Sequence, residues 1–384
     1  MLFESEIEKR VFTKHLWSDY CVGQELLLDQ ITGSKKLGRL PHCSLISARA
    51  GSSQLYVALS MAQTLFCSDE NAPCGICEPC HKVSELMHPD LHFSVPVFGA
   101  NQTSEENQML WRAMVKSKPY LNISQWLDAQ EKESKQANFT AAECRYIIDR
   151  LHLKPYESDK TIMIVWLPEY LGKEGNILLK LLEEPPQNSF LILVTEDISS
   201  IINTILSRAH LFRLKPISDK EFCDFFTSKD IPSTLAESEC ITSEKNLSIA
   251  YQNLIGKTKD GGEFKLDLIR SFFQRIYKGD PIEMIKWIDE FSGLSKENQR
   301  LFLNQFIQVL SMSIRSKISN SNAKSNVELI DFVQKLASIL TLESIEEILH
   351  CAEENLFYLQ RNASMKIVMT DMLIQCSKII KNKN

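Results

Sequence analysis

Two continuous apolar runs constrain the fold of this chain more than any other feature of its sequence. They occupy residues 162–166 and 190–195, and residues 176–182 between them have a helical pattern that closes at Pro185-Pro186. A continuous apolar run suits a strand that is buried on both faces of a parallel sheet. Strands that alternate with helices indicate βαβ units, so the sequence predicts an α/β fold.

Other segments extend this pattern toward the N-terminus. Residues 43–47 and 91–97 are strand candidates, and residues 16–31 and 54–65 carry apolar side chains at helical spacing. Thr140, with Glu143 three residues on, predicts a helix that begins with a capping box. The apolar face of that helix comprises Cys144, Ile147, Ile148 and Leu151.

The strand signal disappears after Pro216, and the rest of the chain reads as helical. We therefore predict an α/β domain at residues 1–216, a small helical domain at 217–262 and an all-helical domain at 263–384. Residues 99–138 are polar with scattered aromatic side chains, and we predict that they are an insertion in the first domain.

The last predicted domain contains four helical segments, at residues 301–314, 327–340, 345–359 and 365–380. In the first of them, Phe302, Phe306 and Leu310 form an apolar stripe at helical spacing. Such a stripe indicates core or helix–helix packing, part of which could be an interface between subunits, rather than a ligand site.

The charge balance restricts the partners of the chain. Its 384 residues include 43 Lys and Arg against 49 Asp and Glu, a net charge of −6. Proteins that coat nucleic acid are usually basic, so we expect contacts with nucleic acid to be local or shared with other subunits. There is no run of about 18 apolar residues and no basic stretch followed by an apolar core at the start, so we expect a cytoplasmic protein.

A cluster of cysteines is the most specific chemical signal. Of the 11 cysteines, four fall close together with the spacing C-x6-C-x2-C-x2-C, namely Cys67, Cys74, Cys77 and Cys80. Four closely spaced thiolates match the tetrahedral ligand set of a structural Zn²⁺ site with no open position. Free thiols and an iron–sulfur cluster are the alternatives, although the spacing differs from common cluster motifs. Four cysteines suffice, so His81 and His88 are not expected to be ligands.

A degenerate phosphate loop follows the first predicted strand. The signature G-x-x-x-x-G-K-[ST] supplies glycines for close backbone approach, a Lys for the phosphates and a hydroxyl for Mg²⁺. Here Ala48 and Ser53 replace the glycines, Gln54 replaces the Lys and Leu55 replaces the Ser or Thr, while Gly51 lies inside the loop. A neutral amide cannot supply the charge and Leu cannot bind a metal, so we expect neither bound nucleotide nor hydrolysis of ATP.

The acidic residues that would hold Mg²⁺ are also missing from the next element. The strand at residues 162–166 should end in carboxylates for that purpose. It is followed instead by Leu167 and Pro168, and the first carboxylate is Glu169. This absence also predicts a chain without ATPase activity of its own.

Several segments together resemble the AAA+ clamp-loader family of bacterial DNA polymerase III. The resemblance rests on residues 22–24 (VGQ), 38–42 (GRLPH), 88–91 (HPDL), 176–186 (NILLKLLEEPP) and 204–208 (TILSR), with Ala209 where the family has Cys. The cysteine module after the phosphate-loop helix is typical of bacterial members. The resemblance covers residues 16–216, and it implies an AAA+ P-loop-type domain with an inserted zinc module, a lid domain and a C-terminal collar that forms oligomers.

Within that family, the motifs of this chain exclude two kinds of subunit. The motor subunits gamma and tau share the cysteine module but need an intact phosphate loop. The delta subunit lacks both the cysteine module and the Ser-Arg motif. The chain therefore resembles a stator that pairs a degenerate nucleotide site with a retained arginine.

The resemblance also implies a role for Arg208, which follows Ser207. It would be an arginine finger that points in trans at ATP bound by a neighbouring gamma or tau subunit, because a planar guanidinium meets phosphate oxygens in a bidentate manner. The implied partners are gamma/tau and delta, with the sliding clamp and primer-template DNA. Without the resemblance, Arg208 would be interpreted as a solvated charge and Thr195 as a loop cap.

Two other functions stay open on the sequence. The chain could be a stand-alone zinc-containing nucleic-acid-binding protein, although its acidic balance and the lack of a basic stripe near the cysteines count against this. It could also be an active ATPase with an unusual loop, which the missing Lys and carboxylates disfavour.

Overall fold

The computed structural model describes residues 13–98, 102–130, 137–255, 266–294, 296–319, 327–360 and 364–382. The chain divides into two compact units, which are described separately. The first comprises Met1–Phe222 with Asn246–Ser248, and the second comprises Cys223–Lys245 with Ile249–Asn384. The predicted domain boundaries at residues 216 and 262 stay predictions.

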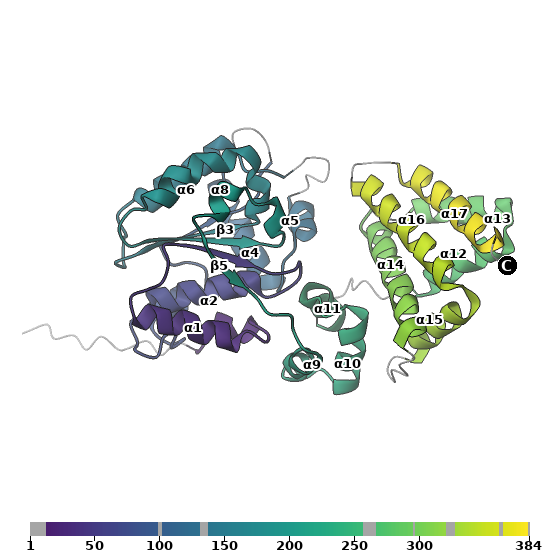
Figure 1. Ribbon diagram of the computed structural model, residues 1–384, viewed down its shortest axis with the longest axis horizontal. Helices are drawn as coiled ribbons and strands as arrows, with labels where there is room; N and C mark the ends of the chain where they lie inside the picture. The colour runs from purple at the N-terminus through teal and green to yellow at the C-terminus, as the bar shows by residue number, and fades with distance from the viewer. Residues whose placement is uncertain are drawn as a thin grey trace, which may run out of the picture. The chain divides into compact units, whose positions relative to one another are not determined.

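The first unit is built on a five-stranded sheet in which every pairing is parallel, in the order β2-β3-β4-β1-β5 (Figure 1). The predicted α/β fold is therefore confirmed. All residues of β3 are buried, as the apolar run requires, whereas β5 at the sheet edge is half-exposed. The strands are β1 (Cys43–Ser47), β2 (Leu91–Ser94), β3 (Thr161–Trp166), β4 (Ser189–Thr195) and β5 (His210–Arg213).

Helices cover both faces of this sheet, with α1 and α2 on one side and α6 and α8 on the other (Figure 1). Helix α2 is buried along its whole length because it lies between the sheet and α1. The helical elements are η1 (Trp17–Tyr20), α1 (Glu25–Lys36), α2 (Gln54–Phe66), α3 (Glu78–Ser84), η2 (Ser104–Asn107), α4 (Gln108–Ser117), α5 (Ile123–Ala129), α6 (Ala141–His152), η3 (Pro168–Leu178), α7 (Leu179–Glu183), η4 (Ile198–Ser200) and α8 (Asn203–Leu206).

The structure corrects three predicted elements. The helix expected at residues 16–31 is two elements, η1 and α1, because Gly23 between them has a φ of +69°, which no helix accommodates. The strand expected at 91–97 ends at Ser94, and Val97 instead forms an isolated antiparallel bridge with Asn138. The helix expected at 176–182 is the end of η3 followed by one short helix, α7.

The predicted capping box of α6 is half correct. The Thr140 hydroxyl accepts a hydrogen bond from the Glu143 backbone N–H, as expected of an N-cap. The Glu143 carboxylate, however, turns inward and is fully buried. It accepts hydrogen bonds from the Ser94 hydroxyl, the Ser104 hydroxyl (2.5 Å) and the Ser104 backbone N–H (2.6 Å). Glu143 therefore joins β2, η2 and α6 instead of closing its own helix.

The segment predicted as an insertion contributes buried aromatic side chains to the first unit. Trp111 of α4 and Trp126 of α5 have no exposed surface. Their rings meet edge to face at 5.5 Å, and Trp111 also contacts Trp166 at the end of β3, with centroids 4.9 Å apart. The aromatic residues that looked scattered in the sequence thus anchor this segment to the sheet; residues 99–101 and 131–136 lie outside the described residues.

After β5 the described chain is helical, and the four predicted C-terminal helices are confirmed. Three of them are longer than predicted, and the helix predicted at residues 327–340 ends one residue earlier. Phe302, Phe306 and Leu310 are at most 1% exposed and form part of one hydrophobic core, so this stripe is internal packing and not a subunit interface. None of the described helices is long and apolar enough to cross a membrane. These helices are α9 (Asp219–Thr227), α10 (Ser233–Thr242), α11 (Leu247–Leu254), α12 (Leu266–Lys278), α13 (Pro281–Ser292), α14 (Lys296–Ser319), α15 (Val327–Ile339), α16 (Leu342–Gln360) and α17 (Met365–Asn382).

The buried Glu143 network predicts a large effect of one substitution. Glu143→Ala should destabilise the first unit by about 2–4 kcal/mol, because the Ser94 hydroxyl and the Ser104 N–H lose a buried acceptor and a cavity remains. Urea unfolding followed by tryptophan fluorescence measures this loss. The control is Glu105→Ala, which removes a surface ion pair with Arg150 and should cost under about 1 kcal/mol. Equal losses in the two variants would contradict the buried role of Glu143.

Candidate functional site

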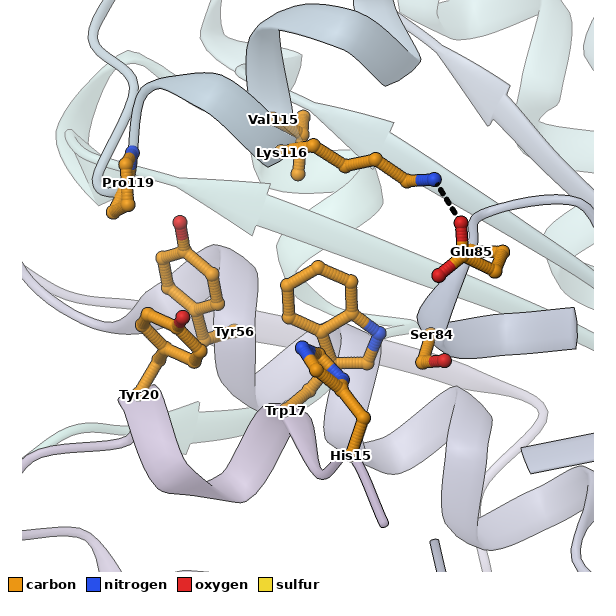
Figure 2. Close-up of a pocket in the computed structure, with 9 residues that line it drawn as sticks. All are labelled: His15, Trp17, Tyr20, Tyr56, Ser84, Glu85, Val115, Lys116 and Pro119. Atoms are coloured by element: carbon orange, nitrogen blue, oxygen red, sulfur yellow. Dashed lines mark hydrogen bonds and ion pairs between the residues drawn. The ribbon is translucent and has the colours of Figure 1, made fainter. Parts of the chain in front are cut away.

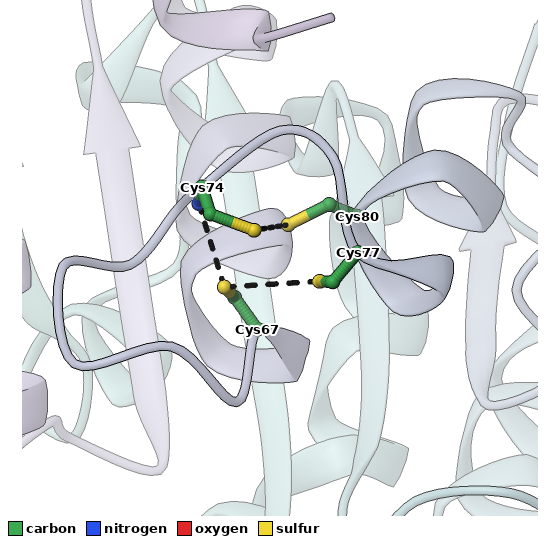
Figure 3. A group of neighbouring side chains, drawn as sticks. All are labelled: Cys67, Cys74, Cys77 and Cys80. Atoms are coloured by element: carbon green, nitrogen blue, oxygen red, sulfur yellow. Dashed lines mark hydrogen bonds between the residues drawn. The ribbon is translucent and has the colours of Figure 1, made fainter. Parts of the chain in front are cut away.

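The four clustered cysteines come together where α2 ends and α3 begins. Cys67 is the residue that follows α2, Cys77 precedes α3, Cys80 lies in α3 and Cys74 lies in the loop between them. Their Sγ atoms all lie within 4.8 Å of one another (Figure 3). The Cys74–Cys80 and Cys67–Cys77 sulfur distances are 4.0 and 3.9 Å.

This arrangement fits a tetrahedral metal site. Four sulfurs at about 2.3 Å from a Zn²⁺ ion would be about 3.8 Å apart, close to the observed spacing. Hydrogen bonds from the Cys80 thiol and from the backbone N–H groups of Cys74 and Asp69 lower the pKa of Cys67 to about 5. The Gly75 N–H likewise donates toward Cys80. Because the thiolate is the form that binds metal, these donors favour the ligand state of Cys67. Burial raises the pKa of Cys77, and the hydrogen bond to Cys67 together with burial raises the pKa of Cys80.

The two nearby histidines lie outside this group of candidate ligands. Among the described residues, the cluster able to hold a metal consists of the four cysteines. His88 is buried and stacks on Phe66 with ring centroids 3.8 Å apart, and its Nδ1 accepts the Asp90 N–H at 3.2 Å. Packing thus accounts for His88 without any metal.

The degenerate phosphate loop lies at the carboxyl edge of the sheet, between β1 and α2. In parallel α/β sheets this edge is where ligands bind, at the point where the strand order reverses. Gly51 keeps the left-handed conformation of such a loop, with a φ of +73°. The backbone N–H groups of the loop are therefore still arranged as in an anion-binding loop. The side chains that lie against Gly51 decide whether the loop can bind a phosphate.

A carboxylate of the chain itself takes up that position. Glu196, which directly follows β4, accepts hydrogen bonds from the Gly51 backbone N–H and from the Gln54 amide at 3.3 Å. Gln54, which replaces the Lys of the signature, is 3% exposed, so it is buried against this carboxylate. A carboxyl group of the chain itself therefore uses donors that would otherwise face a phosphate.

Asn246 closes the loop from another direction. Its Nδ2 donates to the Ala50 carbonyl at 3.2 Å, and the neighbouring Leu247 N–H donates to the Gly51 carbonyl at 2.7 Å. A Cβ atom added at Gly51 would lie 2.0 Å from the Asn246 side chain, which shows how closely the amide covers the loop. The Asn246 amide thus lies over Gly51 on the side where a Cβ atom would project.

The remaining signature positions serve packing. Ser53 is buried and its hydroxyl accepts the Val22 N–H at 3.2 Å, and Leu55 is also buried. The Ser53 hydroxyl thus connects α2 to the segment before α1. Ala48 donates its N–H to the Thr195 carbonyl at 3.3 Å, which continues the β1–β4 pairing into the loop.

The hollow beside the loop has an acidic lining. It has a volume of about 650 Å³, and Glu169, Glu196 and Asp197 line it together with Ala50 and Tyr170. Glu169 accepts the Glu196 N–H at 3.0 Å, and burial raises the pKa of Glu169. Burial and the neighbouring Glu169 raise the pKa of Glu196 to about 7. A triphosphate would meet carboxyl groups here where a phosphate site has cations and N–H donors.

Thr195 and Arg208 both have partners within the first unit. Thr195 is fully buried, and its Oγ1 accepts the Asp197 N–H at 3.1 Å, so it caps the loop after β4. Arg208 follows α8 on the surface, where its Nε and Nη2 donate to Glu183 Oε1 at 3.0 and 2.6 Å. Its Nη1 donates to the Thr204 carbonyl and to the Ser207 hydroxyl, both at 3.1 Å. The guanidinium is thus oriented by its own chain yet 34% exposed.

A second hollow is formed by aromatic packing (Figure 2). It has a volume of about 180 Å³ where η1, α2 and α4 meet. The rings of Tyr20 and Tyr56 stack at 5.0 Å, and Trp17 contacts Tyr56 at 5.7 Å. The Glu85–Lys116 ion pair of 2.5 Å lies beside them. The hollow is thus lined by aromatic rings and this ion pair, together with His15 and Ser84.

The comparison with protein families identifies the first unit. Residues 23–218 match the family model described as "DNA polymerase III, delta subunit". The chain belongs to this family. The match covers the sheet, the cysteine module, the closed loop and Arg208, so the resemblance to clamp-loader subunits stated from the sequence is confirmed, and the chain is of the delta-prime-like kind.

The chain is also similar to individual proteins. The chain is 21% identical to the DNA polymerase III subunit delta' of Bacillus subtilis over 93% of this chain and 97% of the relative. It is 24% identical to the subunit gamma of Buchnera aphidicola over 84% of this chain and 77% of the relative. A crystal structure of a gamma-subunit-related protein from Thermotoga maritima aligns over 92% of this chain and 99% of its own, with 15% identity and a TM-score of 0.37.

Some residues of the site were not found from the sequence. Glu196 had a signal, because polar residues that directly follow a buried strand gather at the carboxyl edge of a parallel sheet. Asn246 had none, since it is 196 positions from Ala50 in the chain. Glu183 lies in the motif at residues 176–186, and its contact with Arg208 depends on the fold.

The cysteine geometry predicts one Zn²⁺ per purified chain. Cys67→Ser should remove or sharply weaken this zinc while the sheet stays folded, because a chain of this length buries ample apolar surface elsewhere. Elemental analysis and circular dichroism measure the two properties. Cys223→Ser, outside the cluster, is the control and should keep its zinc. A metal-free wild-type protein after anaerobic preparation would refute the site.

The buried Glu196 predicts a specific pH dependence. Its raised pKa means that the folded chain binds a proton that the unfolded chain releases near pH 4.5, so the stability falls as the pH rises from about 4.5 to about 7. Glu196→Gln keeps an acceptor for Gly51 but cannot ionise. The variant should therefore be about 1–3 kcal/mol more stable than the wild type at pH 8 and similar at pH 4. Urea unfolding at both pH values tests this, and exposed Glu184→Gln is the control. A stability difference that does not change with pH would contradict a buried Glu196 with a raised pKa.

Proposed function

We propose that this chain is the non-hydrolysing, delta-prime-type stator of a bacterial DNA polymerase III clamp loader. The observation that carries the proposal is the Glu196 carboxylate, which occupies the Gly51 N–H and the Gln54 amide where a phosphate would bind. Asn246 over the loop and the acidic hollow support it further. A subunit with such a loop contributes to the complex by its shape and its contacts, and not by its own ATP cycle.

Arg208 is the residue through which the chain acts on ATP in a neighbouring gamma or tau subunit. Its guanidinium is on the surface, and Glu183, Thr204 and Ser207 fix its orientation. A planar cation of this kind can stabilise the charge on a transferring phosphoryl group in trans. The Glu183 carboxylate accepts hydrogen bonds from Nε and Nη2 of Arg208. A phosphate that binds these two N–H groups must therefore displace the Glu183 carboxylate.

The partners follow from the same role. The chain would bind gamma/tau and delta through its lid at residues 217–262 and collar at 263–384, and the assembled loader would place the sliding clamp on primer-template DNA in the bacterial cytoplasm. The zinc site would be structural, because its four cysteines leave no ligand position open. The family match and the net charge of −6 disfavour a stand-alone nucleic-acid-binding protein.

The proposal predicts a defect that appears only in the complex. Arg208→Ala should leave folding and assembly intact, because an exposed ion pair contributes under about 1 kcal/mol. In a loader reconstituted with gamma/tau and delta, it should lower ATP hydrolysis stimulated by clamp and DNA. Hydrolysis at the one site served should fall by about 10³–10⁵-fold, so the total rate should fall partly. Single-turnover hydrolysis and clamp-loading rates measure this.

Two matched variants sharpen the test. Arg208→Lys should fail nearly as badly as Arg208→Ala, because Lys retains the charge but lacks the planar fork. Arg213→Ala removes an exposed arginine from the far end of β5 and should behave as the wild type. If the Arg208→Ala complex assembles normally and loads clamps at the wild-type rate, Arg208 is a surface charge and not a finger.

A further inference from the structure

A lysine from a distant helix contacts the backbone of the first zinc-site cysteine. Lys35 lies in the last turn of α1, and its Nζ donates to the Cys67 carbonyl oxygen at 2.5 Å. Lys35 is half-buried, whereas the next residue, Lys36, is exposed. The contact joins α1 to the point where α2 ends and the cysteine module begins.

The Lys35 ammonium lies beside a cysteine module that is negatively charged when it holds a metal. Four thiolates around one divalent ion carry a net charge of about −2. Cys67 and Cys80 are at most 3% exposed, so water compensates that charge poorly, and uncompensated buried charge is costly. The Lys35 ammonium lies close enough to interact electrostatically with the sulfurs of Cys67, Cys80 and Cys77.

The same contact restrains the position of a ligand. The Cys67 N–H donates to the Gln63 carbonyl, so Cys67 is the last residue held by the hydrogen bonds of α2. The backbone turns extended at Cys67, with a ψ of 129°, so its own carbonyl leaves the helical hydrogen-bond pattern and accepts from Lys35. By bonding that carbonyl, Lys35 fixes the backbone from which the Cys67 sulfur extends.

We infer that Lys35 is a positioning residue of the zinc centre, which holds Cys67 in place and offsets the negative charge of the four thiolates. Residues that orient or neutralise the ligands of a metal typically change its affinity by roughly 10–100-fold when they are replaced. The inference concerns the metal site alone and does not depend on the role of the chain in a clamp loader.

The test measures zinc affinity in the full-length protein. Competition with a chromophoric chelator gives the affinity for Zn²⁺ of the wild type, Lys35→Met, Lys35→Arg and the control Lys36→Met. Lys35→Met should bind zinc roughly 10–100-fold more weakly, Lys35→Arg should recover most of the affinity because it keeps the charge, and Lys36→Met should equal the wild type.

A second measurement separates this role from simple packing of α1. Thermal unfolding is recorded with and without zinc; if Lys35 acts on the metal, Lys35→Met lowers the midpoint of the zinc-loaded protein more than that of the zinc-free protein. Equal zinc affinity in Lys35→Met and wild type, or equal midpoint losses in the two forms, would overturn the inference, as would a Lys35→Arg variant as weak as Lys35→Met. If Lys35→Met does not fold, Lys35→Gln is measured in its place against the same outcomes.

Discussion

The burial of β3 and β4 on both faces is the constraint on which the rest of the first unit depends. Strands without a polar face can be accommodated only inside a sheet covered on both sides, here by α1 and α2 on one side and α6 and α8 on the other (Figure 1). Parallel pairing then brings the carboxyl ends of β1, β3 and β4 to one edge. The phosphate loop, Glu169 and Glu196 meet at this edge because the sheet places them there.

At that edge the Glu196 carboxyl group takes up hydrogen-bond donors that would face a phosphate in an intact phosphate loop. A phosphate loop concentrates N–H donors, and donors left unsatisfied in a partly buried place are costly. The Glu196 carboxylate satisfies the Gly51 N–H, and Gln54 is a neutral partner for it where a Lys would have formed an ion pair. In the function that we propose, the fold of a nucleotide-binding domain is retained while groups of the protein itself occupy its phosphate loop.

Features encoded by neighbouring residues could be predicted from the sequence. The two buried strands, the cysteine cluster and the altered loop signature each depend on residues close together in the chain, and the structure has all three. Gly23 interrupts a pattern that looks continuously helical, since periodicity alone does not report a positive φ.

The features that the sequence did not reveal depend on residues brought together by folding. Asn246 over Gly51, Glu183 beside Arg208 and Lys35 at Cys67 each join distant parts of the chain. Glu143 shows the same effect within one helix, because its side chain bonds to Ser94 and Ser104 and not to the helix end that the local pattern indicated. A local pattern specifies an element, but the environment of the folded side chain decides its partner.

The central claim is that the phosphate loop is closed by the side chains of Glu196, Gln54 and Asn246. Equilibrium dialysis of the purified chain with radiolabelled Mg²⁺–ATP tests it most directly, with an isolated gamma subunit as the positive control. The account predicts no saturable binding to this chain up to millimolar nucleotide. Saturable, stoichiometric binding at micromolar ATP would contradict it, because the nucleotide would then have displaced Asn246 and the Glu196 carboxylate from the loop.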